Sequence, residues 1–187
     1  TTNILVMSAT LGGASSVAKY LEMVTERPFL LYESTRRETE LIFTPNKGAH
    51  VDKLKDALVF LFSQKGAVEL AFMAAKNRKR VSAEGRDRLS ELAAILEVRK
   101  IASPLFKGVG IYHGGMLPKL LVEAAFRERI LDVVCGTNAL ALGVNLPAEK
   151  VVFAQLVHYH SDQPISKNEF SQMAGRAGRK GLFDPGY

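Results

Sequence analysis

The sequence contains one cysteine, no tryptophan and no long apolar run. Because a single thiol cannot form an internal disulfide bond, the fold has to be stable without one. Cys135 lies in an apolar run, which favours a structural thiol over a nucleophile and fits a reducing compartment, so we expect the cytoplasm. No apolar segment approaches the roughly 20 residues that cross a bilayer, and nothing resembles a signal peptide. We therefore expect a globular protein without membrane contact.

A phosphate-binding loop of the P-loop type is also absent. That motif requires GxxxxGK[ST], and no glycine in the sequence is followed by a lysine. We therefore expect that the chain does not hold the phosphates of ATP in that way.

Positive charge is in excess, because 25 Lys and Arg residues stand against 19 Asp and Glu and give a net charge of +6. This excess favours a polyanionic partner without identifying one. Many of the basic residues fall in one stretch: Lys76 to Arg80, Arg86, Arg88, Arg99, Lys100 and Lys107. A nucleic-acid path and a solvated helix face both remain open interpretations of this stretch.

Short apolar runs alternate with longer amphipathic stretches, which predicts an α/β fold with helices around a mainly parallel sheet. A chain of 187 residues suffices for one main domain with a small appendage. Strands are predicted at Ile4 to Met7, Phe29 to Tyr32, Leu41 to Thr44, Leu58 to Phe62, Val109 to Tyr112, Asp132 to Cys135 and Val151 to Gln155. Helices are predicted at Ser15 to Val24, His50 to Ala57, Lys65 to Lys79, Ala83 to Arg99, Pro118 to Arg129 and Ser166 to Ala174.

The segment QMAGRAGR, residues 172–179, carries two arginines at helical spacing. If it is helical, Gln172, Arg176 and Arg179 project from one face. Its two glycines would each cost about 1 kcal/mol relative to Ala inside a helix, which indicates that another surface comes close there. A guanidinium is always charged and forks around phosphate oxygens, so this face suits a nucleoside triphosphate. The alternative is a solvated basic helix end with Gly181 as its C-cap.

The segment CGTNALALGVNLP, residues 135–147, follows an apolar run and lies just beyond the carboxyl end of a predicted strand. Ligands of open α/β sheets bind at such positions. Thr137 is expected to cap a short helix, where its hydroxyl and the next backbone N–H groups would form an anion site for a nucleic-acid phosphate. Gly143 and Asn145 suit a tight turn that faces a nucleotide. A plain strand-to-helix turn is the alternative.

Two further segments place small or polar residues after a predicted strand. In YHGGMLP, residues 112–118, the backbone N–H groups of the glycine pair could hold a phosphate, whereas a lone His113 near a turn is more often structural. In MSATLGG, residues 7–13, small hydroxyls could tie a strand end to a neighbouring loop. His158 and His160 have no Cys or carboxylate cluster beside them in the sequence, so no metal site is predicted.

Taken in order, SAT, FSQ, YHGGMLP, GTNALALGVNLP and QMAGRAGR resemble helicase motifs III, IV, IVa, V and VI of superfamily two, in particular its superkiller-type DExH-box branch. The resemblance covers nearly the whole chain. It implies the end of a first RecA-like domain at residues 1–27, an interdomain linker at residues 28–40 and a second RecA-like, helicase C-terminal domain at residues 41–187. Because the chain begins TTN and stops at DPGY, where another strand could begin, we expect a fragment that is truncated at its C-terminal end.

The resemblance also implies roles for single residues. Ser8 and Thr10 would couple the nucleotide state to the motion of the two motor domains. The residues expected along the nucleic-acid backbone are Ser63, Gln64, His113, Gly114 and Thr137.

Nucleotide contacts follow from the same resemblance. Gly143 and Asn145 would lie towards ATP, while Gln172 would face the γ-phosphate across the interdomain cleft. Arg176 and Arg179 would act there as arginine fingers, which elsewhere supply roughly a thousand-fold to a hundred-thousand-fold in rate.

Some features depart from the family pattern. Asn138 stands where many relatives have Glu, and residues 73–107 match only loosely. No Asp is followed by Glu, the acidic pair that helicase motors use to hold Mg²⁺ and activate water. We therefore expect ATP and Mg²⁺ to be bound mainly by a first RecA-like domain outside this chain, which alone would not hydrolyse ATP.

The resemblance predicts the C-terminal motor half of an ATP-dependent RNA helicase that moves along and unwinds nucleic acid. Its partners would be single-stranded or duplex nucleic acid, with RNA preferred over DNA, and the first RecA-like domain. Three other hypotheses remain: a DNA helicase of a sister branch, a non-catalytic nucleic-acid-binding module of the same fold, and a small-molecule enzyme with an unrelated α/β fold.

Overall fold

The computed structural model describes residues 4–8, 12–34, 36–45, 50–93, 102–115, 119–142, 144–158 and 161–187. Internal contacts divide the chain into two units, Thr1–Glu38 and Thr39–Tyr187. The linker predicted at residues 28–40 spans this division. Within the described residues, no helix is both long enough and apolar enough to cross a membrane.

In the described residues of the first unit there is one helix, α1 (Ala14–Thr25), which confirms the helix predicted there. The Thr25 hydroxyl donates to the Leu21 carbonyl at 2.6 Å, and the Phe29 N–H donates to the Glu22 carboxylate at 2.9 Å. The strands predicted at residues 4–7 and 29–32 are wrong, because neither segment pairs with another strand in the described part of this unit. Apolar, β-branched composition favours a strand, but only pairing through backbone hydrogen bonds makes one.

The second unit is built on a sheet of four parallel strands in the order β2-β3-β1-β4. Their bounds are β1 Ala57–Phe60, β2 Val109–Tyr112, β3 Val133–Gly136 and β4 Lys150–Phe153. The register places Phe60 opposite Gly136 and Phe153, and Tyr112 opposite Gly136, so the four strands end at the same level. The predicted parallel α/β sheet is therefore confirmed.

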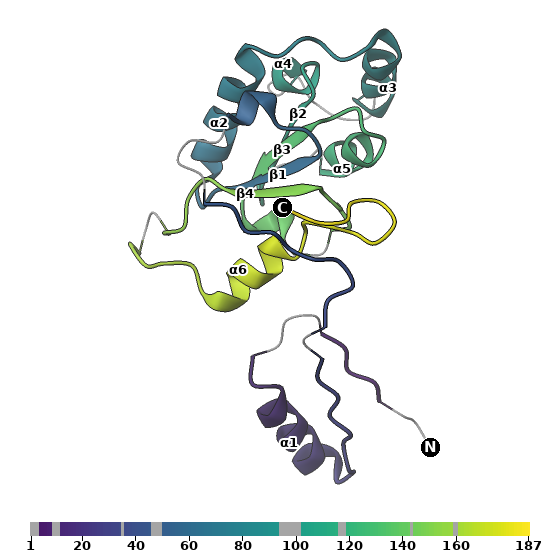
Figure 1. The fold of residues 1–187 in the computed structure, drawn as a ribbon, viewed down its shortest axis with the longest axis vertical. Coiled ribbons are helices and arrows are strands. Elements are labelled where there is room, and N and C mark those ends of the chain that lie inside the picture. The colour runs from purple at the N-terminus through teal and green to yellow at the C-terminus, as the bar shows by residue number, and fades with distance from the viewer. Residues whose placement is uncertain are drawn as a thin grey trace. The chain divides into compact units, whose positions relative to one another are not determined.

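Helices cover both faces of this sheet, and α2 (Gln64–Lys76) and α5 (Lys119–Arg127) lie on opposite sides of it (Figure 1). Four alanines of α2 are buried against one face, where small side chains allow close approach to Val59 and Ile111. The apolar side of α5 packs on the other face, together with Leu89 from α3 (Ala83–Ala93) and Met173 from α6 (Lys167–Ala174). The three strands β1, β2 and β3 are fully buried between these layers, as the apolar runs predicted.

Several predicted boundaries in this unit need correction. The strand predicted at residues 41–44 is reduced to a single bridge between Leu41 and Gly186. The helix predicted at residues 50–57 is a 3-10 turn, η1 (Val51–Lys53), because Ala57 already begins β1. The short helix α4 (Ala102–Leu105) was not predicted. The last residues of the helix predicted at 83–99, and Pro118, lie outside the described residues.

Cys135 is buried in the centre of the sheet on β3. Burial raises the pKa of its thiol to about 12, so the thiolate is not formed near neutral pH. The thiol is therefore inert, as its apolar sequence surroundings predicted.

Candidate functional site

The carboxyl ends of three adjacent strands bring three of the predicted segments together. Ser63 follows β1, His113 follows β2 and Thr137 follows β3, and these strands are neighbours in register. Because all strands run in the same direction, these residues lie along one edge of the sheet. The position predicted for each of these three segments, just after the carboxyl end of a strand, is therefore confirmed, and their role as a ligand site stays a prediction.

Ser63 is the N-cap of α2. Its hydroxyl accepts a hydrogen bond from the Gly66 N–H at 3.1 Å, which satisfies one of the free donors of the first turn. Gln64, the first residue of the helix, is exposed. A Cβ built on Gly115 would lie 3.4 Å from the Gln64 side-chain oxygen, so the loop after β2 adjoins the start of α2. Ser63 thus has a structural task, whereas Gln64 is open to a ligand.

His113 is half-buried at the end of β2. Burial, with a smaller contribution from the charge of Lys119, lowers the pKa of its imidazole, so the ring is neutral at pH 7. Its Nδ1 atom is buried and has no hydrogen-bond partner among the described residues. Gly114 is exposed, and a Cβ placed on it would meet nothing within 4 Å. The backbone at Gly114 is therefore accessible from solution.

Thr137 occupies the N-cap position of a 3-10 helix, η2 (Asn138–Leu140), as the sequence predicted. Its hydroxyl accepts no capping hydrogen bond, so this part of the expectation is wrong. The residue is 7% exposed, and its N–H donates to the Tyr112 carbonyl at 3.1 Å. A Cβ on the preceding Gly136 would lie 2.2 Å from that carbonyl oxygen, so only glycine permits this approach of β2 and β3.

Arg176 lies beyond the end of α6, which stops at Ala174 with Gly175 as its C-cap. The helical arrangement that would place Gln172, Arg176 and Arg179 on one face is therefore not realised. The Arg176 guanidinium donates to the backbone carbonyls of Ala141 and Val144, in the loop that follows η2. Burial lowers the pKa of this arginine from its ordinary value, yet it stays charged near neutral pH. Arg176 thus ties the segment after α6 to the loop after β3.

Arg179 differs from Arg176 because it is exposed. One N–H of its guanidinium donates to the Asn145 side-chain oxygen at 3.2 Å. Next to it, Ala148 and Ala177 form a parallel bridge, and the Gly178 N–H donates to the Ala148 carbonyl at 2.9 Å. The arginine segment and the loop that carries Asn145 therefore run side by side and present a guanidinium and an amide together.

Gly178 has a backbone conformation that is not helical. Its φ of +76° is a left-handed conformation that favours glycine. A Cβ there would lie 2.6 Å from Thr39 Cγ2 and 3.1 Å from the Gly186 backbone. The close approach predicted from the glycines of the segment is confirmed at Gly178. The alternative that made Gly181 a helix C-cap is wrong, because the helix ends seven residues earlier.

The remaining predicted site residues are less defined. Gln172 is half-buried on α6, and Ser8 is exposed in the first unit. Thr10 and Gly143 lie outside the described residues. The backbone acceptors of Arg176 were not predicted, since every residue carries a carbonyl and the sequence has no signal for the two that are used.

A family model for the helicase conserved C-terminal domain matches residues 26–181, which is most of the chain. The chain belongs to this family. The loops at the strand ends and the arginine segment after α6 are thus parts of a helicase C-terminal domain with the RecA-like fold that the resemblance implied.

The relatives of this helicase domain are Ski2-like DExH-box helicases. The chain is 30% identical to the mouse exosome RNA helicase MTR4 over 93% of its length and 16% of that protein. It is 34% identical to the Arabidopsis thaliana ATP-dependent DNA helicase homolog MER3 over 72% of its length and 13% of that protein. It is 36% identical to the Saccharomyces cerevisiae antiviral helicase SKI2 over 59% of its length and 8% of that protein. The chain therefore spans less than a fifth of each of these relatives.

Proposed function

We propose that this domain is the C-terminal motor half of an ATP-dependent RNA helicase that moves along a strand by gripping its phosphates. The observation that carries the proposal is the pair of hydrogen bonds from Arg176 to Ala141 and Val144. Thr137, at the strand-end edge, and Asn145, beside Arg179, belong to the two ends of this same loop. The residue proposed to contact the nucleic-acid strand, Thr137, and the residue proposed to lie towards the nucleotide, Asn145, would thus be connected by the loop that Arg176 holds.

The two arginines have different surroundings, which supports different roles. Arg179 is exposed and makes one hydrogen bond to a neutral side chain, so its remaining N–H groups are free to turn towards a phosphate. The Arg176 guanidinium instead donates to two backbone carbonyls. We therefore assign the finger that stabilises charge growing on the terminal phosphate to Arg179, and the positioning of the loop to Arg176.

ATP and Mg²⁺ would be held mainly by a first RecA-like domain. Among the described residues of this chain, no three His, Cys, Asp or Glu side chains converge on one point, and Mg²⁺ is usually bound through carboxylates. The guanidinium of Arg179 and the amide of Asn145 suit the triphosphate alone. Bound ATP with its metal would supply the hydrolysis that drives movement, and this domain would orient the terminal phosphate.

The strand-end edge would contact the nucleic-acid backbone rather than its bases. Gly114 is exposed there and has no side chain that could read a base edge, and the amide of the exposed Gln64 can donate to a phosphate oxygen. Backbone contacts of this kind do not distinguish RNA from DNA unless they reach the 2′-hydroxyl. Both an RNA helicase and a DNA helicase homolog occur among the relatives, so a DNA motor is the second candidate.

The test of the proposal is Arg179→Ala in the full-length protein. We expect RNA-stimulated ATP hydrolysis to fall by roughly a thousand-fold or more, the range that arginine fingers contribute elsewhere, while single-strand binding is largely kept. Steady-state ATPase assays with and without RNA, paired with fluorescence anisotropy on a labelled strand, measure the two effects. Unchanged turnover would remove Arg179 from the reaction.

Arg176→Ala is the matched comparison, because it removes the same charge three residues earlier in the same segment. We expect it to lower the thermal stability of the domain as well as turnover, since two carbonyls lose their donor. If both variants behave alike, the division of roles between the arginines is wrong.

A further inference from the structure

A second basic site lies at the opposite edge of the sheet from the strand-end loops. A cavity of about 350 Å³ is lined by Arg80, Arg86, Ser103, Phe106 and Lys107. The Val81 N–H donates to the Phe106 carbonyl at 2.9 Å, which holds the loop after α2 against the end of α4. Lys107 stands two residues before β2 begins at Val109. The cavity therefore lies at the amino edge, roughly one strand length of about 10 Å away from the residues proposed to grip a strand.

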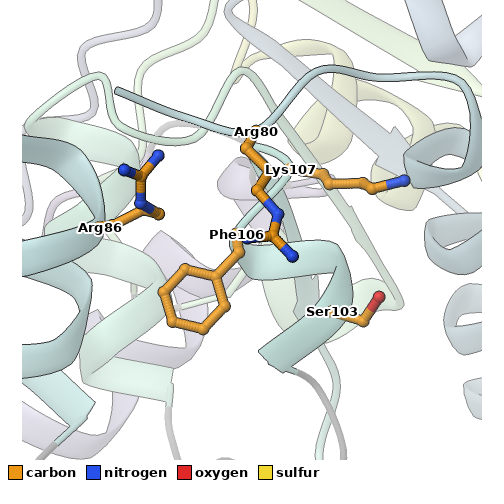
Figure 2. A pocket seen from close by; sticks show the side chains of 5 residues that line it. All are labelled: Arg80, Arg86, Ser103, Phe106 and Lys107. Atoms are coloured by element: carbon orange, nitrogen blue, oxygen red, sulfur yellow. The ribbon is translucent and has the colours of Figure 1, made fainter. Parts of the chain in front are cut away.

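Two of the three cations in this cavity are fixed in place. The Arg86 guanidinium donates to the Val81 carbonyl at 3.0 Å, and the Lys107 ammonium donates to the Lys76 carbonyl at 3.1 Å. Figure 2 shows the Lys107 ammonium pointing away from the other four labelled side chains. Lys107 thus contributes its stem to the wall, and the charge inside the cavity comes from Arg80 and Arg86.

Arg80 is the cation of this cavity whose side chain has no partner among the described residues. Within the described part of the chain, it forms no hydrogen bond and no ion pair, although in Figure 2 its guanidinium reaches towards Phe106 and Ser103. Among the described residues that line the cavity, none is acidic. Glu84 is an exposed neighbour of Arg86 on α3 and does not line the cavity, although the charge of Arg86 contributes to lowering the pKa of this carboxylate. Arg80 is exposed, so its guanidinium is hydrated by solvent and can exchange that water for the oxygens of an anion, while Arg86 adds a second positive charge to the cavity wall.

The uncharged walls narrow the chemistry of that anion. Phe106 packs one side against the main core and lines the cavity with the other, and Ser103 adds a hydroxyl. An aromatic ring beside guanidiniums offers a stacking surface for a base next to donors for a phosphate. The volume is at the small end of the range of about 300 to 1,000 Å³ that ligand pockets occupy, which limits the ligand to about the size of one nucleotide.

We propose that Arg80, Arg86, Ser103 and Phe106 form a binding site for a single nucleotide phosphate, separate from the helicase motifs. Arg80 and Arg86 clasp the phosphate oxygens, Ser103 donates a hydrogen bond and Phe106 stacks on the base. The nucleotide comes either from a free nucleoside monophosphate or from the phosphorylated end of a strand. The site does not depend on the proposed motor function.

The experiment is a titration of the 187-residue chain with AMP, followed by the backbone amide signals in ¹H–¹⁵N NMR spectra. We expect saturable shifts at Ser103, Phe106 and Lys107, and we expect Thr137 at the other edge to report any separate binding there. Arg80→Ala should weaken AMP binding at the cavity by about ten-fold, the loss of one hydrogen bond to a charged group, while leaving the fold intact. Arg80→Lys should recover part of it, because the charge remains and the fork is lost.

Arg127→Ala serves as the matched control, since Arg127 is an exposed arginine on α5 whose side chain donates to the Glu123 carbonyl of its own helix. It removes the same charge and should leave AMP binding unchanged. If Arg127→Ala weakens binding as much as Arg80→Ala does, the attraction is unspecific and the site is rejected.

Four further ligands test the assignment. Adenosine and inorganic phosphate should each bind more weakly than AMP, and equal binding by either would overturn a nucleotide site. A 5′-phosphorylated trinucleotide that shifts the same amides as tightly as AMP assigns the site to strand ends, whereas weaker binding assigns it to free nucleotides. A phosphoserine peptide that binds more tightly than AMP would overturn the proposal. Loss of RNA-stimulated ATPase activity in Arg179→Ala has no bearing on any of these results.

Discussion

Single residues show how much of this domain depends on close backbone contact. Gly178 and Gly181 lie three residues apart, and both have a φ near +76°. They differ in their surroundings, because a Cβ on Gly178 would press against Thr39 and Gly186, whereas one on Gly181 would meet nothing within 4 Å. The pair therefore separates the cost of a left-handed backbone from the cost of crowding.

We predict that Gly178→Ala destabilises the domain by roughly 2 kcal/mol or more, from a left-handed alanine and an overpacked contact. Gly181→Ala should cost about 1 kcal/mol, from the backbone conformation alone. Urea denaturation followed by circular dichroism gives both free energies of unfolding. Equal losses of unfolding free energy in the two variants would show that Thr39 and Gly186 move away from the added methyl group without destabilising the domain.

At the scale of elements, the ends of β1, β2 and β3 act together because their register aligns them. Thr137 is the residue of this edge whose hydroxyl is expected to contact a strand phosphate, and that hydroxyl is not spent on capping η2. Only a small part of the side chain is exposed, so the contact would be a single hydrogen bond.

We predict that Thr137→Ala weakens single-strand binding by up to about ten-fold, and equally for strands of different sequence, because a phosphate contact carries no base information. Thr137→Ser keeps the hydroxyl and should bind nearly as the native residue does. Anisotropy titrations with poly-uridine and poly-adenosine oligonucleotides compare the sequences. A loss confined to one sequence would argue for contact with a base.

The strands β1, β2 and β3 could be predicted from the sequence because each is a short apolar run buried on both faces, and the half-buried edge strand β4 because it contains two valines and a phenylalanine. Residues 4–7 and 29–32 are also short apolar runs, but a run of residues does not reveal whether a partner strand lies beside it. The short α4 contains Pro104 and is too brief for a periodic signal. The strand-end residues were predictable because a parallel sheet places them at one edge. The end of α6 was not predictable, because Arg176 and Arg179 continue the helical spacing from Gln172 although the helix ends at Ala174.

At the scale of the whole molecule, the helicase motifs account for one edge of the main unit and leave the other edge unexplained. The chain covers 16% of the length of mouse MTR4 and 13% of that of MER3 from Arabidopsis thaliana. Its net charge of +6 suits either nucleic acid. The choice of substrate therefore has to be measured on the full-length protein.

We predict that single-stranded RNA stimulates ATP hydrolysis by the full-length protein more than DNA of matched length and sequence does. Preference for RNA requires contacts that sense the 2′-hydroxyl, so the difference should persist when the salt concentration is raised and phosphate contacts weaken. ATPase rates at several salt concentrations with both strands give the comparison. Greater stimulation by DNA would favour the DNA motor instead.

The bonds of Arg176 to the Ala141 and Val144 carbonyls also affect how sequence variation at this joint should be interpreted. A carbonyl is supplied by every amino acid, so substitutions at positions 141 and 144 can preserve both bonds, whereas no other side chain offers the paired donors of Arg176. Pairwise substitution patterns would therefore fail to detect this contact. The contact between these two loops therefore requires arginine at position 176 but allows different side chains at positions 141 and 144.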